Sequence, residues 1–180
     1  MRVIAGSARS LVLSFPKGTH TRPTTDAMRE ALFASLAERV EQARFADLYA
    51  GSGSVGIEAL SRGAEHAVFL EKDNRCVEAL RRNLHSTHLE ESATVIRGPV
   101  ERHWSRVAAE HGPFDIVFAD PPYDLAGFEK TVMRLVVDWE GVAADGLVVI
   151  QCPTTFGTDE IPQPSRARRY GESEFRFYER

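Results

Sequence analysis

The sequence predicts a doubly wound α/β domain, in which helices cover both faces of a mostly parallel sheet. Three observations carry this prediction: short apolar runs typical of buried strands, amphipathic helical segments between them, and a glycine-rich loop directly after the first of these runs. The length of 180 residues suits one domain with a sizeable core. In such a sheet, ligands bind at the carboxyl ends of the strands.

The central part of the chain alternates regularly between strands and helices. Strand-like runs lie at 45–49, 67–70, 94–96, 114–119 and 147–150. Apolar residues with helical spacing lie between these runs, at 54–62, 74–85, 100–110 and 126–138. In the second of these helices, Val77, Leu80 and Leu84 share one face. Five β units joined by helices indicate parallel strands with crossover connections.

Both ends of the chain add to this unit. Residues 1–23 hold two short β-prone runs and are expected to form a small β-hairpin arm, which divides the chain into 1–23 and a larger unit over 24–180. A helix should begin near Thr24–Asp26, because threonine caps a helix and aspartate suits its positive end. At the other end, 166–170 and 174–178 flank Gly171 and predict an antiparallel hairpin.

Composition and charge narrow the functional classes. No apolar run approaches the roughly 20 residues of a membrane helix, and Cys76 and Cys152 have no metal-ligand spacing. We therefore expect a cytoplasmic protein with no metal and no membrane contact. The net charge of −4 argues against a nucleic-acid binder, but residues 1–29 hold five basic residues against Asp26 alone. This distribution predicts a basic arm on an acidic body.

A glycine-rich loop follows the first strand. The pattern Gly51-x-Gly53-x-x-Gly56 is typical of a turn and helix N-terminus that surround a nucleotide cofactor. Glu71 ends the second strand, where an acid can bind ribose hydroxyls. Either a nicotinamide dinucleotide or S-adenosylmethionine (SAM) would suit this pattern. Asp47 favours SAM, because a carboxylate there suits the cationic amino end of SAM and not an anionic pyrophosphate.

The fourth strand runs directly into Asp120-Pro121-Pro122-Tyr123. The prolines stiffen this loop, and the Asp120 carboxylate and the Pro121 carbonyl can both accept hydrogen bonds from an exocyclic amine. Tyr123 offers a flat face on which an extruded base can stack. Two acceptors would draw the amine towards tetrahedral geometry and free its lone pair for attack on a sulfonium methyl. The loop therefore predicts methyl transfer to the amine of a nucleobase.

In this order, the motifs resemble those of the class I, Rossmann-like SAM-dependent methyltransferases. They are most similar to the RsmD-type 16S ribosomal RNA guanine-N2 methyltransferases, over nearly the whole chain. Besides the two loops, the resemblance includes Met1–Gly6, Arg22–Asp26, Arg29-Glu30, Glu58–Ala64, Asn83 and Tyr170-Gly171. It implies a monomer with a seven-stranded sheet. The implied reaction is methyl transfer from SAM to N2 of one guanine in the helix 31 loop of 16S rRNA, within an assembling 30S particle.

The resemblance also implies roles for individual residues. The target guanine would be held by Asp120, Pro121 and Tyr123. The SAM site would comprise Asp47, Ala50, Gly51 and Gly53 at the methionine end, Glu71 at the ribose, Lys72 and the Val100 amide at the adenine, and the closing segment of Arg22, Thr24, Thr25 and Asp26. RNA would be contacted by Arg2, Arg9, Lys17 and Arg29, with a salt bridge on the helix surface as the alternative for Arg29.

Two positions depart from the family pattern: Pro99 stands where an acid often lies beside the adenine, and Gln151 stands where glutamate is common. Three other functions also fit part of the sequence. An Asp-Pro-Pro-Tyr loop serves DNA adenine-N6 methyltransferases, although 180 residues leave no room for a separate target-recognition domain. The glycine loop alone would suit an NAD-dependent oxidoreductase. A catalytically silent RNA-binding factor would need neither Asp120 nor Tyr123.

Overall fold

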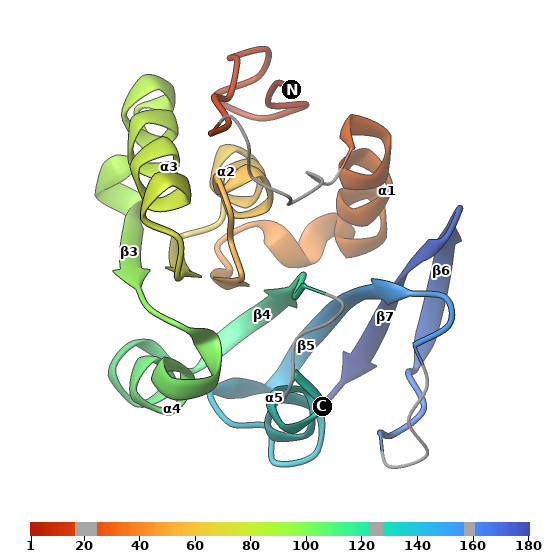
Figure 1. Cartoon of the computed structure of the whole chain (residues 1–180). Helices are drawn as coiled ribbons and strands as arrows, with labels where there is room; N and C mark the ends of the chain where they lie inside the picture. Colours follow the sequence, from red (N-terminus) through yellow and green to blue (C-terminus); the bar gives the residue numbers. More distant parts are fainter. Residues whose placement is uncertain (17–24, 123–127, 157–160) are drawn as a thin grey trace.

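The seven strands form one mixed sheet in the order β3-β2-β1-β4-β5-β7-β6 (Figure 1). The strands are β1 (Arg44–Leu48), β2 (His66–Glu71), β3 (Ala93–Arg97), β4 (Phe114–Ala119), β5 (Val142–Pro153), β6 (Arg166–Tyr170) and β7 (Ser173–Glu179). Strands β1 to β5 pair in parallel, whereas β7 pairs antiparallel with both β5 and β6. The predicted parallel sheet with a terminal antiparallel hairpin is therefore confirmed.

The computed structural model describes residues 1–16, 25–122, 128–156 and 161–180. Four of the predicted site residues lie outside these ranges: Lys17, Arg22, Thr24 and Tyr123. Within the described ranges, no helix is long and apolar enough to cross a membrane.

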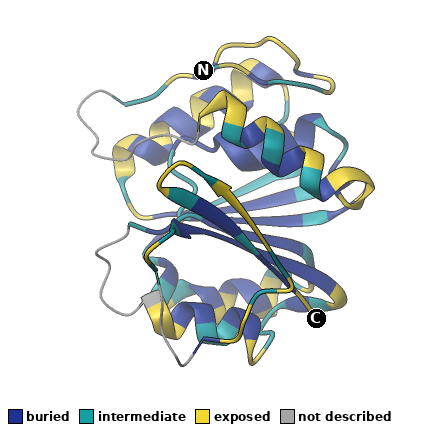
Figure 2. Cartoon of the chain, turned by 90° about the vertical axis from the view of Figure 1, so that its right-hand side faces the viewer, coloured by how far each residue is buried: buried dark blue, intermediate teal, exposed yellow. Residues whose placement is uncertain are grey.

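Helices lie on both faces of the sheet (Figure 2). They are α1 (Asp26–Leu36), α2 (Ser54–Ser61), α3 (Asn74–Thr87), α4 (Val100–His111) and α5 (Phe128–Val136), with short 3-10 helices η1 (Ala37–Val40) and η2 (Glu90–Ser92). The arm and α1 to α3 pack on one face, and α4 and α5 pack on the other. The apolar runs of the central strands are continuous because both of their faces are covered in this way.

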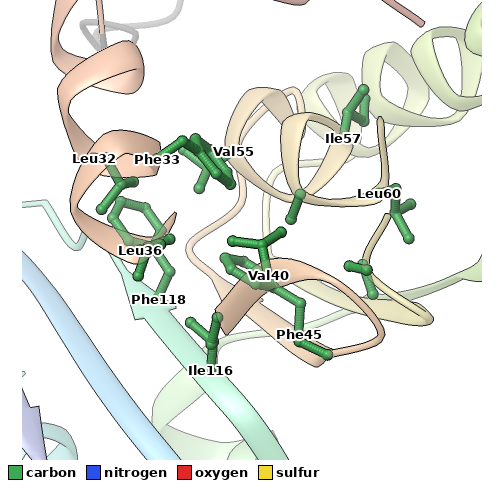
Figure 3. Packing of buried hydrophobic residues seen from close by; sticks show 14 of the residues in the cluster. Leu32, Phe33, Leu36, Val40, Phe45, Val55, Ile57, Leu60, Ile116 and Phe118 are labelled. Atoms are coloured by element: carbon green, nitrogen blue, oxygen red, sulfur yellow. The ribbon is translucent and has the colours of Figure 1, made fainter. Parts of the chain in front are cut away.

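Two apolar clusters, one on each face, make up the core. Because successive side chains of a strand alternate between the faces, Phe45 points to the cluster below α1 and α2, and Ala46 points to the other. Figure 3 shows the first cluster, where Phe33 of α1 and Val55 of α2 meet Phe118 of β4. The sheet therefore fixes the positions of α1 and α2 relative to the strand ends.

Strand β5 is longer than the sequence predicts. It begins at Val142 and not at 147, and its pairing with β4 shifts register between Phe114 and Ile116. Asp145 and Gly146 interrupt the apolar pattern at this irregularity, so the first half of the strand gives no apolar signal.

The N-terminal arm is a short antiparallel pairing. It has a single bridge, Arg2↔Val12, and the Val3 amide donates to the Leu11 carbonyl at 2.9 Å. Val3 and Leu13 are buried in the same cluster as α1 and α2. The arm therefore packs on the sheet-covering helices through apolar contacts.

Candidate active site

The candidate site lies where the strand order reverses, between β1 and β4. The chain passes from β1 to β2 on one side and from β4 to β5 on the other, which opens a crevice beyond the carboxyl ends of these strands. Asp47 lies near the carboxyl end of β1, and Asp120 follows β4 directly. Leu48 pairs with Ala119, and alternation of the side chains places both acids on the face covered by α1 and α2.

The glycine loop adopts a tight turn between β1 and α2. Tyr49, Gly51 and Gly53 all have positive φ, and the Gly53 amide donates to the Ala50 carbonyl at 2.8 Å. Gly53 has a φ of +82°, which L side chains rarely adopt, and a Cβ there would lie 2.1 Å from Leu80 Cδ1, so both conformation and packing favour glycine. A Cβ on Gly51 would meet nothing within 4 Å, so this position faces open space that a ligand can approach.

The third glycine brings α2 close to the sheet. A Cβ on Gly56 would lie 2.3 Å from the Phe69 ring and 3.0 Å from Asp47 Oδ2. The Gly56 amide instead donates to Asp47 Oδ2 at 2.8 Å. Burial, and to a smaller extent the charge of Glu71, raise the pKa of Asp47 to about 7 despite this hydrogen bond. Asp47 is thus a buried acid that a cation in the crevice would stabilise in its ionised form.

Glu71, at the end of β2, holds the glycine loop. Its Oε2 accepts a hydrogen bond from the Gly51 amide and its Oε1 accepts one from the Asp73 amide, both at 2.8 Å. Each carboxylate oxygen retains a second lone pair that a ribose hydroxyl can use. The Gly98 amide donates to the Glu71 carbonyl at 2.9 Å, which brings the start of α4 at Val100 beside this strand end. The predicted ribose and adenine residues are therefore neighbours, with Lys72 exposed at the rim.

Asp120 and Pro121 line the other side of the crevice. The Asp120 amide donates to the Leu48 carbonyl at 3.3 Å, which ties the loop to β1, and Pro121 is buried. Burial and the nearby charge of Asp47 raise the pKa of Asp120 to about 7. The two acids therefore influence each other across the switch point.

Tyr49 is a site residue that the sequence does not reveal. Its hydroxyl donates to Glu101 Oε1 at 2.6 Å, and burial together with this hydrogen bond to a carboxylate raises the Tyr49 pKa far above its ordinary value. The glycine loop is thereby anchored to the first turn of α4. No local pattern predicts this contact, because the two residues are 52 positions apart.

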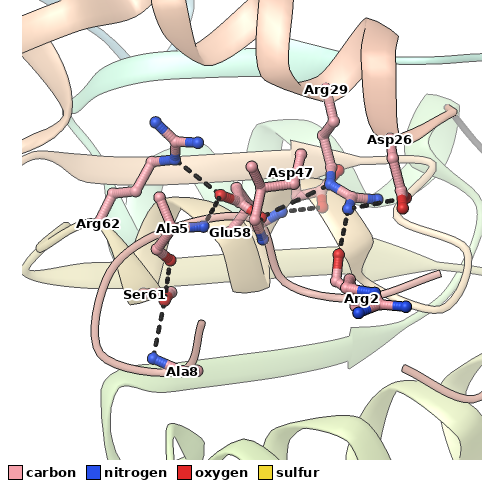
Figure 4. A network of polar contacts seen from close by, with 11 residues as sticks. Arg2, Ala5, Ala8, Asp26, Arg29, Asp47, Glu58, Ser61 and Arg62 are labelled. Carbon is pink, nitrogen blue, oxygen red and sulfur yellow. Dashed lines mark hydrogen bonds and ion pairs between the residues drawn. The ribbon is translucent and has the colours of Figure 1, made fainter. Parts of the chain in front are cut away.

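Arg29 lies in the interior of the protein and not on the surface, where a contact with RNA would require it to be. Its side chain is fully buried, its Nη2 donates to the Arg2 carbonyl at 2.5 Å, and it forms ion pairs with Asp26 and Glu58 (Figure 4). A phosphate contact by Arg29 is therefore wrong for this structure. The alternative of a salt bridge is right in kind but wrong in place, because the pair with Glu58 is buried and does not lie on the helix surface. The physical reason is that α1 turns this residue towards the arm and α2, and its apolar neighbours exclude solvent.

Helix α2 carries the groups that hold the arm (Figure 4). Both oxygens of the buried Glu58 accept arm amides, from Ile4 at 2.8 Å and from Ala5 at 3.0 Å. Ser61 Oγ donates to the Ala5 carbonyl at 2.6 Å and accepts from the Ala8 amide at 3.0 Å. The Glu58–Ala64 segment of the family resemblance therefore contains the docking groups for the arm.

Asn83 joins the arm to the glycine loop. Its Oδ1 accepts from the Ser14 amide at 2.7 Å, and its Nδ2 donates to the carbonyls of Ser14 at 3.0 Å and Ser52 at 2.9 Å. The side chain is 1% exposed. One buried amide therefore fixes the end of the arm against the loop that lines the crevice.

The remaining predicted residues lie at the rim. Thr25 Oγ1 accepts from the Met28 amide at 3.2 Å, which confirms the predicted cap of α1, and the Asp26 side chain is half exposed while it contacts Arg29. Arg2 and Arg9 are exposed on the arm. In the part of the chain that the structure describes, no group of three His, Cys, Asp or Glu side chains could hold a metal ion.

Comparisons with known proteins agree with this geometry. A family model described as conserved hypothetical protein 95 matches residues 1–179. Ribosomal RNA small subunit methyltransferase D of Escherichia coli is 33% identical over 183 residues, which cover 100% of this chain and 90% of that protein.

Solved structures show the same architecture. A hypothetical protein of Thermus thermophilus superposes with a TM-score of 0.84 at 34% identity, covering 100% of this chain and 99% of that one. An RNA methyltransferase from Salinibacter ruber in complex with S-adenosyl-L-homocysteine, 16% identical, shares the fold with a TM-score of 0.66 over 88% of this chain and 93% of that one. The chain thus belongs to the conserved hypothetical protein 95 family, the RsmD family of methyltransferases.

Proposed function

We propose that this protein transfers a methyl group from SAM to the exocyclic N2 of a guanine in 16S rRNA. One observation carries the proposal: Asp120, a partly buried acid whose pKa is raised, is followed by the buried Pro121 next to the strand end that leads into the glycine loop. The rRNA substrate is supported by the name of the Escherichia coli relative, which the chain matches over its full length.

The residues around the crevice fit SAM. Asp47 would face the cationic amino end, next to Ala50, Gly51 and Gly53, where the open space beside Gly51 lets a ligand approach the backbone. Glu71 would bind the ribose hydroxyls, and the Val100 amide at the start of α4 would face the adenine beside Lys72. A buried acid in this place disfavours an anionic pyrophosphate, which argues against NAD. When bound, SAM supplies an electrophilic methyl group.

On the opposite wall, the residues of the Asp-Pro-Pro-Tyr loop would hold the guanine. The ionised Asp120 carboxylate and the Pro121 carbonyl would accept the two N–H bonds of the amine, and Tyr123 would stack on the base. Ionised Asp120 would also take up the proton that the amine loses. A pKa of about 7 suits this role, because the group can gain and lose a proton at neutral pH.

The wider setting of the reaction is part of the proposal. The substrate would be the helix 31 loop within an assembling 30S particle, and the enzyme would act as a monomer in the cytoplasm. The exposed Arg2 and Arg9, together with Lys17, would contact the RNA backbone from the arm.

The proposal is tested with Asp120→Ala. We expect methyl transfer to 30S particles to be lost while the dissociation constant for SAM, measured by calorimetry, changes less than about threefold, since Asp120 faces the base. The exposed Asp138→Ala is the matched control and should keep full activity. Mapping of N2-methylguanine in 16S rRNA from a deletion strain gives the identity of the target. An unchanged methylation pattern in that strain contradicts the assignment, and wild-type turnover by Asp120→Ala contradicts the role of this acid.

A further inference from the structure

We propose that the β6–β7 hairpin binds the sugar-phosphate backbone of the RNA substrate through Arg168, with Tyr170 on the same face of the strand. This surface is separate from the arm, because β6 is an edge strand of the sheet whereas the arm packs on the helices of one face (Figure 1). The inference rests on the proposed function, because it takes RNA as the substrate.

The registers of four strands connect this surface to the active site. Ala119 of β4 pairs with Ile150 of β5, so the next residues, Asp120 and Gln151, lie side by side. Gln151 pairs with Phe175 of β7, and Phe175 pairs with Arg168 of β6. Partners in a register share a face, so this row lies on the face that carries Asp47 and Asp120. Three strand spacings place the backbone of Arg168 about 14 Å from that of Asp120. A chain of nucleotides entering the crevice can span this distance.

The direction of the hairpin also points to the site. Strand β5 runs towards the carboxyl edge, and β7 is antiparallel to it, so the turn between Tyr170 and Ser173 lies at the edge where Asp120 lies. The end of β6 that carries Arg168 and Arg169 is therefore its active-site end.

The charge of β6 is strongly positive. The strand reads Arg-Ala-Arg-Arg-Tyr, with three arginines and no acid, in a part of the chain that is otherwise acidic. Arg166 is already engaged, because its guanidinium stacks on Phe177 at 4.3 Å and donates to the Ser35 carbonyl. The Arg168 side chain is exposed, and it has no hydrogen bond or ion pair within the residues that the structure describes. It is thus available to a phosphate.

The neighbouring groups complete this surface. Arg169 pairs with Glu174 and points to the opposite face, where it contacts this buried acid at 3.3 Å, so it is not part of the surface. Glu172 is the acid of the turn. The half-buried Tyr170 ring rests on Phe175 with centroids 5.6 Å apart, which holds it firmly. Exposed arginine beside a fixed aromatic ring is the combination with which proteins bind single-stranded nucleic acid.

Protection of a sheet edge is the competing explanation. β6 is an edge strand, and charged side chains on such strands prevent pairing with other molecules. That explanation predicts self-association when the charge is removed, whereas a backbone contact predicts weaker RNA binding with a smaller dependence on salt.

The test is Arg168→Ala, compared with Arg106→Ala on α4, an exposed arginine on the other face of the sheet. Binding to 30S subunits from a deletion strain is measured at several salt concentrations. For Arg168→Ala we expect about three- to tenfold weaker binding and a salt slope reduced by about 0.7–0.9. Arg106→Ala should match the wild type, and the melting temperature and SAM affinity should be unchanged in both variants.

Two results overturn the inference: unchanged binding and salt slope, or self-association of Arg168→Ala with unchanged binding. Charge reversal by Arg168→Glu should weaken binding further than Arg168→Ala, and equal effects of the two variants would also count against a phosphate contact. Failure of the proposed function is distinguishable, because the wild type would then not methylate these subunits at all. If the wild type methylates them and Arg168→Ala binds normally, only the hairpin surface is rejected.

Discussion

At the scale of single residues, two acids define the electrostatics of the crevice. Asp47 is buried near the end of β1 and the partly buried Asp120 directly follows β4, and desolvation raises the pKa of each to about 7. In the unliganded protein, ionisation of either acid is therefore opposed by burial and by the charge of another carboxylate. A cation beside Asp47 would relieve this opposition, which is a physical reason for the cationic amino end of SAM at this place.

The raised pKa values predict how stability depends on pH. Both acids have a folded-state pKa near 7 and an ordinary value of 3.8, so the folded state binds more protons between these values. The stability that protonation contributes is complete below about pH 3.8 and is lost as the pH rises through about 7. We expect the free energy of unfolding of the unliganded protein to fall between pH 5 and pH 7, by at most about 1.4 kcal/mol per pH unit for each acid.

Urea unfolding at pH 5, 6, 7 and 8 measures this dependence. Asp47→Asn should flatten the curve, because an amide does not titrate, while the exposed Asp138→Asn should keep the wild-type slope. If the free energy of unfolding of Asp47→Asn falls with pH as steeply as that of the wild type, Asp47 is not responsible for the pH dependence.

Individual residues also show where sequence reasoning stops. The positions of Asp47, Glu71 and Asp120 were predictable, since each lies at or next to the carboxyl end of a strand. The burial of Arg29 and the docking role of Glu58 were not, because they depend on partners in the arm 27 and 54 positions away. A charged side chain on a helix gives no local sign of which face it occupies.

At the scale of elements, the strands and helices were predictable because each carries its own periodicity. The central five strands follow from short continuous apolar runs, and the four helices between them follow from apolar residues spaced with period 3.6. The first half of β5 did not follow, because Asp145 and Gly146 interrupt its apolar pattern. The arm was predictable as a β-prone segment, but its place on α2 was not, because it depends on long-range hydrogen bonds and apolar contacts.

The docking of the arm on α2 yields a prediction with a matched control. A Cβ on Gly6 would lie 1.6 Å from the Ser61 carbonyl oxygen, whereas a Cβ on Gly171 would meet nothing within 4 Å, and both glycines have positive φ. Gly171→Ala should therefore cost only the backbone strain, about 1 kcal/mol. Gly6→Ala adds the steric clash to the same backbone strain, so we expect its loss of folding stability to exceed that of Gly171→Ala by at least about 2 kcal/mol.

Thermal unfolding measures the stability difference, and limited proteolysis of residues 1–16 shows whether the arm has left α2. Equal stability of the two variants, with an arm equally resistant to protease, would mean that Gly6 is not needed for docking.

At the scale of the whole molecule, the charges are arranged around the crevice. Arg2 and Arg9 are exposed on the arm, and Arg168 is exposed on the hairpin at the edge of the sheet. The net charge of −4 conceals this arrangement. Overall charge is therefore a poor guide to RNA binding in this chain, and the position of each basic residue on the sheet decides its use.

The arm predicts a separate effect on RNA binding. Replacement of Arg2 and Arg9 by alanine should weaken binding to 30S subunits about tenfold and reduce the salt slope by up to about 1.8, while the dissociation constant for SAM stays unchanged. The double replacement Arg81→Ala with Arg82→Ala, exposed residues of α3, serves as the control for the loss of two charges. Unaltered binding would mean that the basic arm is only a solvated surface.

The anchoring of the arm has a consequence for how the chain is synthesised. The amides of Ile4 and Ser14 bind side chains that follow them by 54 and 69 residues. The N-terminal part of a chain is synthesised first, so the arm is made before Glu58 and Asn83, the residues that bind it. The arm therefore has no docking partners until α2 and α3 have been translated. Its exposed arginines reach their final positions only after the glycine loop has also been made.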